Sequence, residues 1–164
     1  MFILKYAYEK INRKSAPYYY NYSFLTIIKK PIRKFLANVA TPICPFNNIR
    51  IFLYRLCGFK IGRDCFIGMH CYFDDMCYDL MHIGNDVTIS YGVYFACHGK
   101  NQAHLPITIE DGAYIGMCSR IISKNKEVEG VTIGRNAVVG ACTLVNKNVP
   151  AGAKAVGVPC KIIR

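Results

Sequence analysis

From Ile61 onward, hydrophobic residues recur every six positions along the chain. Each six-residue unit opens with an aliphatic or aromatic residue, often has glycine next, and carries a small residue at its fifth position. Ile61, Ile67 and Phe73 open the first three units. An amphipathic helix would repeat its apolar face about every 3.6 residues and a half-buried strand every 2. A period of six instead predicts a solenoid built from short repeated segments.

The units gather in four blocks of three, which open at residues 61, 83, 109 and 133. These openings are 22, 26 and 24 residues apart, so each block carries an insertion, and every insertion follows the third unit. Three flat strands with tight corners make one triangular coil, and coils stacked about 4.8 Å apart bury a continuous aliphatic column. We therefore predict a mainly β protein, a parallel β-helix of about four coils over residues 61–164.

Two further features of the repeat support this prediction. Glycine at the second position of a unit permits close backbone approach and unusual dihedral angles at each turn. The small residues are expected to fit the corners: they are Cys65, Cys71, Val87, Val93, Ala113, Ser119, Ala137 and Thr143. Cys65, Cys71 and Cys77 are six residues apart, so we interpret them as compact core residues. Three separate corners would not let these thiols converge on a metal ion.

Composition narrows the class of protein. The chain has 164 residues, of which 52% are hydrophobic and 19% charged, and this balance excludes wholesale disorder. No run of 18 apolar residues occurs, so no spanning helix is expected. The nine cysteines are odd in number and include no Cys-x-x-Cys pair, and no export signal is visible at the start. We expect a reduced, cytoplasmic protein with no metal.

The net charge of +11 lies entirely in the first third of the chain. Residues 1–63 contain twelve Lys or Arg and one acid, whereas residues 64–164 contain nine of each. We therefore divide the chain into a basic, aromatic-rich segment, 1–60, and a repeat domain, 61–164. The segment includes an apolar and basic stretch at 24–36 and an amphipathic helix at 47–56. It suits either peripheral contact with the inner face of an anionic membrane or a helical cap on the β-helix. Nucleic-acid binding is not expected, because no motif for it accompanies the charge.

The insertions share one corner of the coil, which is where we expect function. His98 begins the longest insertion, and the preceding coil brings Asp74 and Asp75 beneath it. A neutral imidazole beside a carboxylate is a general base at neutral pH. We predict His98 as that base and Asp75 as the acid that orients it, although Asp74 or Asp79 could serve equally well. Cys97 lies within a repeat strand, so we interpret it as a packing residue.

Five side chains around this corner could contact an acceptor with several hydroxyl groups. They are Asp74, Tyr78, Asp79, Lys100 and His104. The chain contains no Gly-x-Ser-x-Gly elbow, Walker motif or Gly-x-Gly-x-x-Gly fingerprint. Direct transfer between two bound substrates is therefore favoured over a covalent acyl-enzyme.

Residues 50–164 resemble the hexapeptide-repeat acyltransferases, and within them the sugar O-acetyltransferases. The resemblance rests on the six-residue repeat, the loop with His98, the run Pro106-Ile107-Thr108-Ile109-Glu110-Asp111-Gly112-Ala113-Tyr114-Ile115-Gly116, and the ending from Ala155 to Arg164. It implies a left-handed parallel β-helix, a homotrimer with clefts between subunits, and acetyl-CoA as the acyl donor. It also implies that His98 is catalytic, in agreement with its position in the coil.

The same resemblance implies which residues contact the donor. Gly116 and Met117 follow one strand and Ala141 another, at positions that meet coenzyme A in the family. Lys161 and Arg164 match terminal basic residues that hold its phosphates. Tyr114 and Met117 depart from the family pattern, which often has Trp and a small residue at these two positions.

We therefore expect an acetyl-CoA-dependent O-acyltransferase that acts on a saccharide hydroxyl, either a surface polysaccharide or a lipid-linked sugar. An amine acceptor stays open, since the same base could serve it. Two other functions were weighed. A γ-type carbonic anhydrase would need three zinc-binding histidines, and His98 and His104 lack the expected spacing. A non-catalytic structural or assembly protein is the other alternative.

Overall fold

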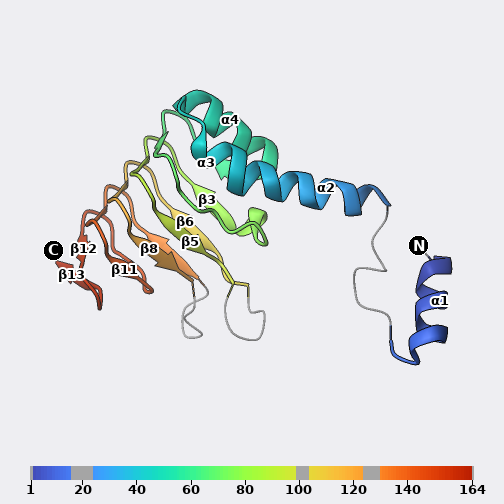
Figure 1. The fold of residues 1–164 in the computed structure, drawn as a ribbon. Helices are drawn as coiled ribbons and strands as arrows, with labels where there is room; N and C mark the ends of the chain where they lie inside the picture. Colours follow the sequence, from blue (N-terminus) through green and yellow to red (C-terminus); the bar gives the residue numbers. More distant parts are fainter. Residues whose placement is uncertain (1, 16–23, 99–103, 124–129, 164) are drawn as a thin grey trace. The chain divides into compact units, whose positions relative to one another are not determined.

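The computed structural model describes residues 2–15, 24–98, 104–123 and 130–163 (Figure 1). The chain forms two compact units, Met1–Phe35 and Leu36–Arg164. The first contains two helices, α1 (Phe2–Asn12) and α2 (Phe24–Phe35). No helix among the described residues is both long and apolar enough to cross a membrane.

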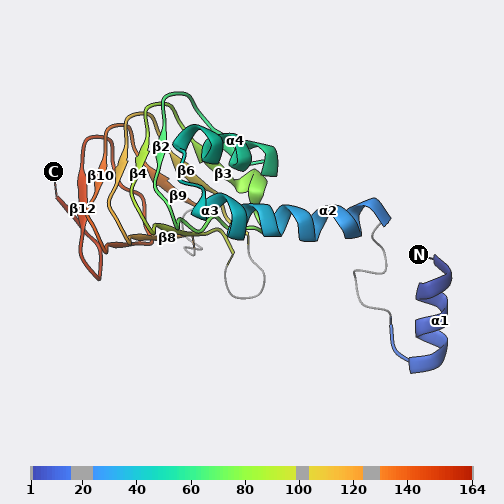
Figure 2. The same ribbon diagram turned by 45° about the horizontal axis from the view of Figure 1, so that its top comes forward.

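The second unit is a parallel β-helix with three faces (Figures 1 and 2). Face A stacks β1 (Lys60–Ile61), β3 (Met81–Ile83), β6 (Ile107–Ile109) and β9 (Val131–Ile133). Face B stacks β2 (Phe66–Ile67), β4 (Thr88–Ile89), β7 (Tyr114–Ile115), β10 (Val138–Val139) and β12 (Lys154–Val156), and then β13 (Lys161–Ile163). Face C stacks β5 (Tyr94–Ala96), β8 (Arg120–Ile122) and β11 (Leu144–Val145).

The predicted fold is confirmed, and each of the four blocks contributes one strand to face A. Strands within a face pair in parallel, except that β13 runs antiparallel to β12. The predicted insertions also leave the coil at one place, the corner where face C turns into face A. Face A resumes after the short helix η3 (Tyr78–Leu80) in the first coil and after the segment that begins at Cys97 in the second.

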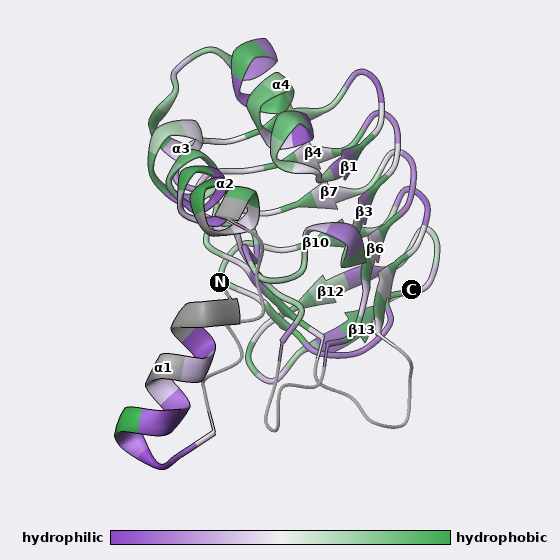
Figure 3. Cartoon of the chain, turned by 90° about the vertical axis from the view of Figure 1, so that its right-hand side faces the viewer, coloured by the Kyte–Doolittle hydropathy of each residue, from purple (hydrophilic) through white to green (hydrophobic). Residues whose placement is uncertain are grey.

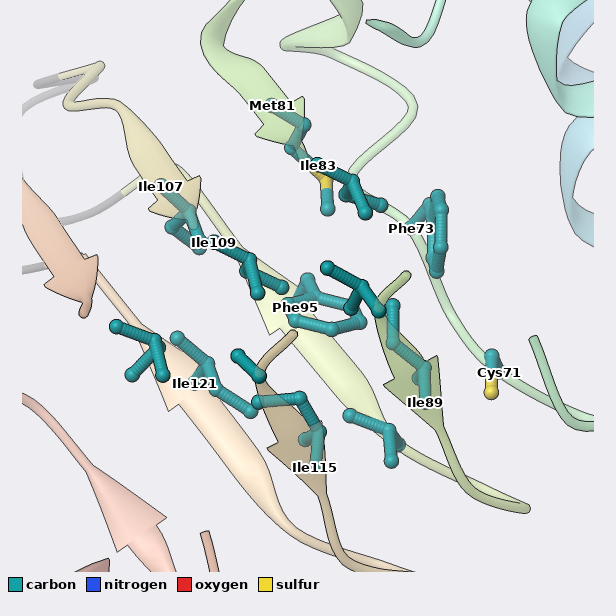
Figure 4. Packing of buried hydrophobic residues seen from close by; sticks show 14 of the residues in the cluster. Cys71, Phe73, Met81, Ile83, Ile89, Phe95, Ile107, Ile109, Ile115 and Ile121 are labelled. Atoms are coloured by element: carbon teal, nitrogen blue, oxygen red, sulfur yellow. The ribbon is translucent and has the colours of Figure 1, made fainter. Parts of the chain in front are cut away.

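The core is the column of residues that open the repeat units (Figure 4). Ile67, Ile89 and Ile115 lie above one another on face B, and none of the three is exposed. On face C, Phe73 packs edge-on against Phe95, with ring centroids 5.1 Å apart. All eight predicted corner residues are buried as expected.

Of the two roles predicted for glycine at the second position, the structure shows close backbone approach but not the unusual dihedral angles. A Cβ added to Gly68 would lie 2.5 Å from the backbone nitrogen of Tyr91, so this glycine is needed for close approach between coils. Positive φ angles, however, fall on the fourth position of the unit instead of the second. His70 has φ of 56° and Asp86 has φ of 54°, at the turn just before the small corner residue. The turn, and not the glycine, is therefore where the left-handed conformation occurs.

Helix α4 (Asn47–Cys57) covers the open end of the first coil. The side chain of Asn47 donates to the carbonyl oxygen of Cys65 and accepts from the amide of Ile67, each at 3.0 Å. The buried guanidinium of Arg50 donates to the carbonyl of Ile67. These side chains replace the hydrogen bonds that a further coil would make, so the end of the β-helix is not an exposed sheet edge.

The cap extends over residues 36–58 and is anchored by an aromatic cluster. It begins with a π-helical turn, η2 (Leu36–Ala40), and α3 (Thr41–Ile43). Tyr54 is fully buried, stacks on Phe73 with centroids 4.3 Å apart, and donates to the carbonyl of Cys71. The structural division at residue 35 therefore precedes the change in charge near residue 60, because residues 36–58 pack onto the coils.

Candidate active site

The candidate site lies at the corner where face C turns into face A, between the first and second coils. Asp74 directly follows Phe73, and His98 follows β5 by two residues. The two strands are in register, since Tyr72 pairs with Tyr94 and the amide of Phe95 donates to the carbonyl of Tyr72. Strand stacking therefore brings together two residues that are 24 positions apart in the sequence.

Asp74 has no exposed surface and holds the start of the His98 loop through one oxygen atom. Its Oδ2 accepts from the backbone amides of Cys97 at 2.8 Å and of His98 at 3.1 Å. The same oxygen lies 2.5 Å from Nδ1 of the His98 ring. Its Oδ1 accepts from the amide of Met76 at 3.1 Å. Four contacts thus compensate this carboxylate for its loss of water.

This arrangement determines which nitrogen of His98 can act. The carboxylate accepts the hydrogen bond from Nδ1, so the proton of the neutral ring lies on Nδ1 and the lone pair on Nε2. The His98 side chain is 38% exposed, whereas Asp74 is fully buried. The geometry therefore presents a basic nitrogen at the surface, with its orientation and tautomer held from within.

The residue predicted to orient His98 is corrected by these contacts. We expected Asp75, but the carboxylate against the imidazole is that of Asp74. The chain turns directly after Asp74, since the amide of Cys77 donates to the Asp74 carbonyl and that of Met76 to its Oδ1. The register therefore places Asp74, the last residue before the turn, against the histidine.

Cys97 is a packing residue, as predicted. Its side chain is fully buried, and burial followed by the negative charge of Asp74 raises the pKa of its thiol far above the ordinary value. A thiol that stays protonated at neutral pH is a poor nucleophile.

The other residues predicted to contact the acceptor fall into different environments. His104 forms an antiparallel bridge with His98, so the loop returns beside the histidine, and the His104 side chain is exposed. Asp79 is exposed in η3. Tyr78 is buried and packs against Phe59 with centroids 5.0 Å apart, so it belongs to the core and its ring is not available to a sugar. Lys100 lies outside the described residues.

The residues expected to bind the donor gather at another corner, where face B turns into face C. Met117 is 52% exposed, and Ala141 is exposed on the next coil. A Cβ on Gly116 would lie 2.5 Å from the backbone nitrogen of Ala141, so glycine is needed here for the coils to stack. Lys161 is exposed and pairs with Val156, whose side chain lies against Gly140 beside Ala141. Arg164 lies outside the described residues.

The backbone amides at this second corner differ in whether they donate a hydrogen bond to a neighbouring coil. The amides of Gly140 and Cys142 donate to the neighbouring coils, to the carbonyls of Ala155 and Met117. Within the described part of the chain, the amide of Ala141 between them meets no acceptor. It is therefore a hydrogen-bond donor at an exposed position.

The two corners are well separated within one chain. The whole of face C lies between them. The pairing of Tyr94 with Arg120 places Cys118 beside Gly92 of the neighbouring coil, and His98 lies six residues beyond Gly92. At about 3.3 Å per residue this amounts to roughly 20 Å. The base and the predicted donor-binding residues of one copy therefore do not form a single compact site.

An aromatic column near His98 was missed in the sequence. Tyr72 stacks on Tyr94, with centroids 4.5 Å apart and planes 13° apart, and the guanidinium of Arg120 lies 5.9 Å from the Tyr94 ring centroid. Burial, and then the charges of Asp75 and Asp74, raise the pKa of the Tyr72 hydroxyl well above its ordinary value. The sequence contains a signal for this column, because Tyr72, Tyr94 and Arg120 all occupy the sixth position of the second unit in their blocks.

These observations define the class of protein: a capped parallel β-helix with an aspartate–histidine pair at the corner that carries its insertions. No family model matches the chain. A serine acetyltransferase from Bacillus licheniformis is 34% identical over 108 residues, which are 65% of this chain and 45% of that protein. The chain spans about half, or less, of the length of the curated relatives it matches first.

Two solved structures are similar over most of their length. A maltose O-acetyltransferase from Clostridium difficile has a TM-score of 0.61 at 23% identity, over 95% of both chains. A hexapeptide-repeat-containing acetyltransferase from Vibrio cholerae, solved with acetyl-coenzyme A, has a TM-score of 0.56 at 23% identity. That match covers 87% of this chain and 90% of the other. At such identity these matches show the fold.

Together with the sequence match, they confirm the resemblance seen in the repeats. The chain shares the fold of these hexapeptide-repeat acetyltransferases and is similar in sequence to a serine acetyltransferase over 65% of its own length.

Proposed function

We propose that the protein is an acetyl-CoA-dependent O-acyltransferase that transfers an acetyl group to a saccharide hydroxyl. The observation that carries this proposal is the hydrogen bond from His98 Nδ1 to the buried Asp74, which leaves Nε2 available at the surface. Such a nitrogen can remove a proton from an alcohol as that alcohol attacks a thioester.

The proposed reaction proceeds by direct transfer. His98 Nε2 takes the hydroxyl proton while the acceptor oxygen bonds to the thioester carbonyl carbon. The resulting tetrahedral intermediate collapses, the carbon–sulfur bond breaks, and the imidazolium returns the proton to the departing thiolate. Asp74 acts as a positioning residue that stabilises the imidazolium during this step. No covalent acyl-enzyme is required, in agreement with the burial that raises the pKa of the Cys97 thiol.

The donor is proposed to lie along the corner that carries Met117, Ala141 and Lys161. The amide of Ala141, a residue at an exposed position, is suited to donate to the thioester carbonyl oxygen as negative charge develops on it. The Lys161 ammonium is suited to a phosphate of coenzyme A. Acetyl-CoA is bound by the Vibrio cholerae protein, whose fold this chain shares.

We also propose a homotrimer, and the separation of the two corners supports it. Within one chain, roughly 20 Å of face C lies between His98 and the donor residues. A neighbouring copy that places its donor corner against the His98 corner would complete the site. Each cleft would then use residues from two subunits.

The acceptor class rests on the open corner around His98, where His104 and Asp79 expose polar side chains. The relatives are named for acceptors with a hydroxyl group, serine and maltose. We propose a saccharide in a surface polysaccharide or on a lipid carrier, modified in the cytoplasm at the inner membrane face. An amine acceptor would use the same base.

Thiol release from acetyl-CoA, measured with a panel of sugars, tests this proposal. We expect His98→Ala to reduce turnover about 10²–10⁴-fold, the usual contribution of a general base. His70→Asn is the matched control, because His70 is exposed on the first coil and asparagine tolerates its positive φ. Equal activity of His98→Ala and wild type would remove His98 from the mechanism. Absence of release with every sugar and amine would argue against the transferase itself.

A further inference from the structure

The basic first third divides into two parts with different roles. The arginines of helix α4 serve the cap: Arg50 donates to the carbonyls of Cys44 and Ile67, and Arg55 donates to that of Ile61. Helix α2 belongs to the other compact unit. The cap therefore accounts for the charge of α4, whereas the charge of α2 belongs to a different unit.

Helix α2 separates most of its apolar residues from its basic residues. At about 100° per residue, Leu25, Ile28, Ile32 and Phe35 fall within an arc of about 80°. Lys29, Lys30, Arg33 and Lys34 occupy the opposite arc of about 140°. The helix contains no acidic residue, and Figure 3 shows both green and purple positions on it.

The apolar arc is exposed to an unusual degree. Leu25, Ile32 and Phe35 are 64%, 61% and 61% exposed, and Ile28 is 43% exposed. Four large apolar side chains along one face of a single helix form a continuous patch of the kind that marks an interaction surface. Their burial in an apolar phase would be strongly favourable.

We propose that α2 lies in the surface of an anionic membrane, with its apolar arc in the acyl region and its basic arc toward the headgroups. Charge complementarity selects this occupant, because every charged residue of α2 is a cation and anionic lipid attracts cations. Lys29 borders the apolar arc, so its long aliphatic stem can follow the apolar surface while its ammonium reaches the headgroups. A strongly amphipathic, cationic helix with bulky apolar residues is typical of interfacial binding.

This inference deepens the proposed function, since it favours an acceptor carried on a membrane lipid. Its test is independent of catalysis. The full chain is sedimented with vesicles of phosphatidylcholine alone and with vesicles containing about one-third phosphatidylglycerol. We expect binding to the anionic vesicles that weakens as salt is raised, because screening reduces the electrostatic part.

Three single substitutions, each to glutamine, make the test specific. Ile32→Gln removes one apolar anchor and is expected to weaken partitioning about tenfold. Arg33→Gln removes one charge and is expected to weaken it about fivefold. Phe66→Gln is the matched control, because Phe66 is 49% exposed on the outside of the first coil, and it should leave binding unchanged. The melting temperature of each variant confirms that the coil unit is folded.

Two results would overturn the proposal. Equal binding of wild type and Ile32→Gln to anionic vesicles would show that α2 is not the contact. Absence of vesicle binding, together with a smaller oligomer for Ile32→Gln by light scattering, would show that a second copy covers the apolar arc. Since neither readout requires acetyl transfer, failure of this inference would leave the transferase proposal untouched. Likewise, failure of the transferase proposal would not change the interpretation of the vesicle-binding experiment.

Discussion

The change Asp74→Asn removes one negative charge from the site and keeps the shape of the side chain. Three N–H donors converge on Oδ2 of Asp74: the amides of Cys97 and His98 and the Nδ1 of the His98 ring. An asparagine will therefore place its carbonyl oxygen at this position. The Nδ1–H tautomer of His98 is kept, so the variant isolates the effect of charge.

The magnitude follows from what the charge does during the reaction. When His98 becomes an imidazolium, its charge lies roughly 4 Å from the carboxylate, and with an effective dielectric constant near 20 the attraction is about 4 kcal/mol. This sets an upper limit of about 10³-fold on the rate. A hydrogen bond to a charged group exceeds one to a neutral group by about 1–2 kcal/mol, which sets a lower limit near tenfold. We expect a loss of kcat/KM of about 10²-fold.

The substitution also has a structural cost. In the wild type, the N–H of Met76 donates to Oδ1 of Asp74. The NH₂ group of the asparagine must take the place of Oδ1, so it faces this N–H. Two donors then oppose each other in a buried position, which costs about 1–3 kcal/mol in free energy of unfolding. Thermal denaturation measures this loss and shows whether enough folded protein remains for kinetics.

The assay is thiol release from acetyl-CoA with the best acceptor, compared among wild type, Asp74→Asn and Asp75→Asn. Asp75→Asn is the matched control, since Asp75 is the neighbouring acid and does not make the contact with His98 Nδ1. It should retain activity within about threefold. Nitrogen NMR of the His98 ring gives a readout without an acceptor: the proton should reside on Nδ1 in both wild type and Asp74→Asn.

The reasoning would be refuted by either of two results. One is activity of Asp74→Asn within about threefold of wild type. The other is a neutral His98 ring whose proton lies on Nε2 in the wild type, because that nitrogen could not then accept a proton.

Three further predictions concern stability and thiol chemistry. Gly68→Ala should lower the free energy of unfolding by about 3 kcal/mol or more in urea denaturation, because its Cβ would lie 2.5 and 2.6 Å from backbone atoms of the next coil; an unchanged value would contradict the stacking described. Burial raises the pKa of Cys71 from 9.0 to about 11, so between pH 9 and 11 the unfolded chain releases this proton while the native state keeps it. Stability should therefore fall as pH rises through this window, less steeply in Cys71→Ala, and equal slopes would count against it. Maleimide at neutral pH should label the exposed Cys118 and Cys142 but not the buried Cys97. Mass spectrometry of the labelled native protein checks this, and labelling of Cys97 before the other two would contradict it.

Much of the fold could be predicted because the repeat is local and redundant. Each block restates the same six-residue pattern, so the strands at Ile67, Ile89 and Ile115 predict one another even if one unit is irregular. The insertions could be located in the same way, as departures from a fixed period. Position in the repeat also identifies the column of Tyr72 and Tyr94, although that inference was missed.

The candidate site was only partly predictable, because it depends on contacts between coils. Register brought both Asp74 and Asp75 beneath His98, yet which carboxylate turns toward the ring depends on the direction of one side chain. Tyr78 illustrates the same limit: its place beside the insertion suggested contact with a sugar, and packing on Phe59 placed it in the core. Neither outcome follows from residue type.

By itself, the sequence determined the period of the coil, the corner at which insertions leave it, and the division of charge along the chain. These are properties of spacing and composition, which short-range geometry converts directly into strands and turns. Only the tertiary structure decided that Asp74 holds His98, that α4 caps the first coil, and that the base and donor corners lie apart. Those features depend on side-chain direction and on packing between segments distant in sequence, where a shift of one residue reverses which side chain faces inward.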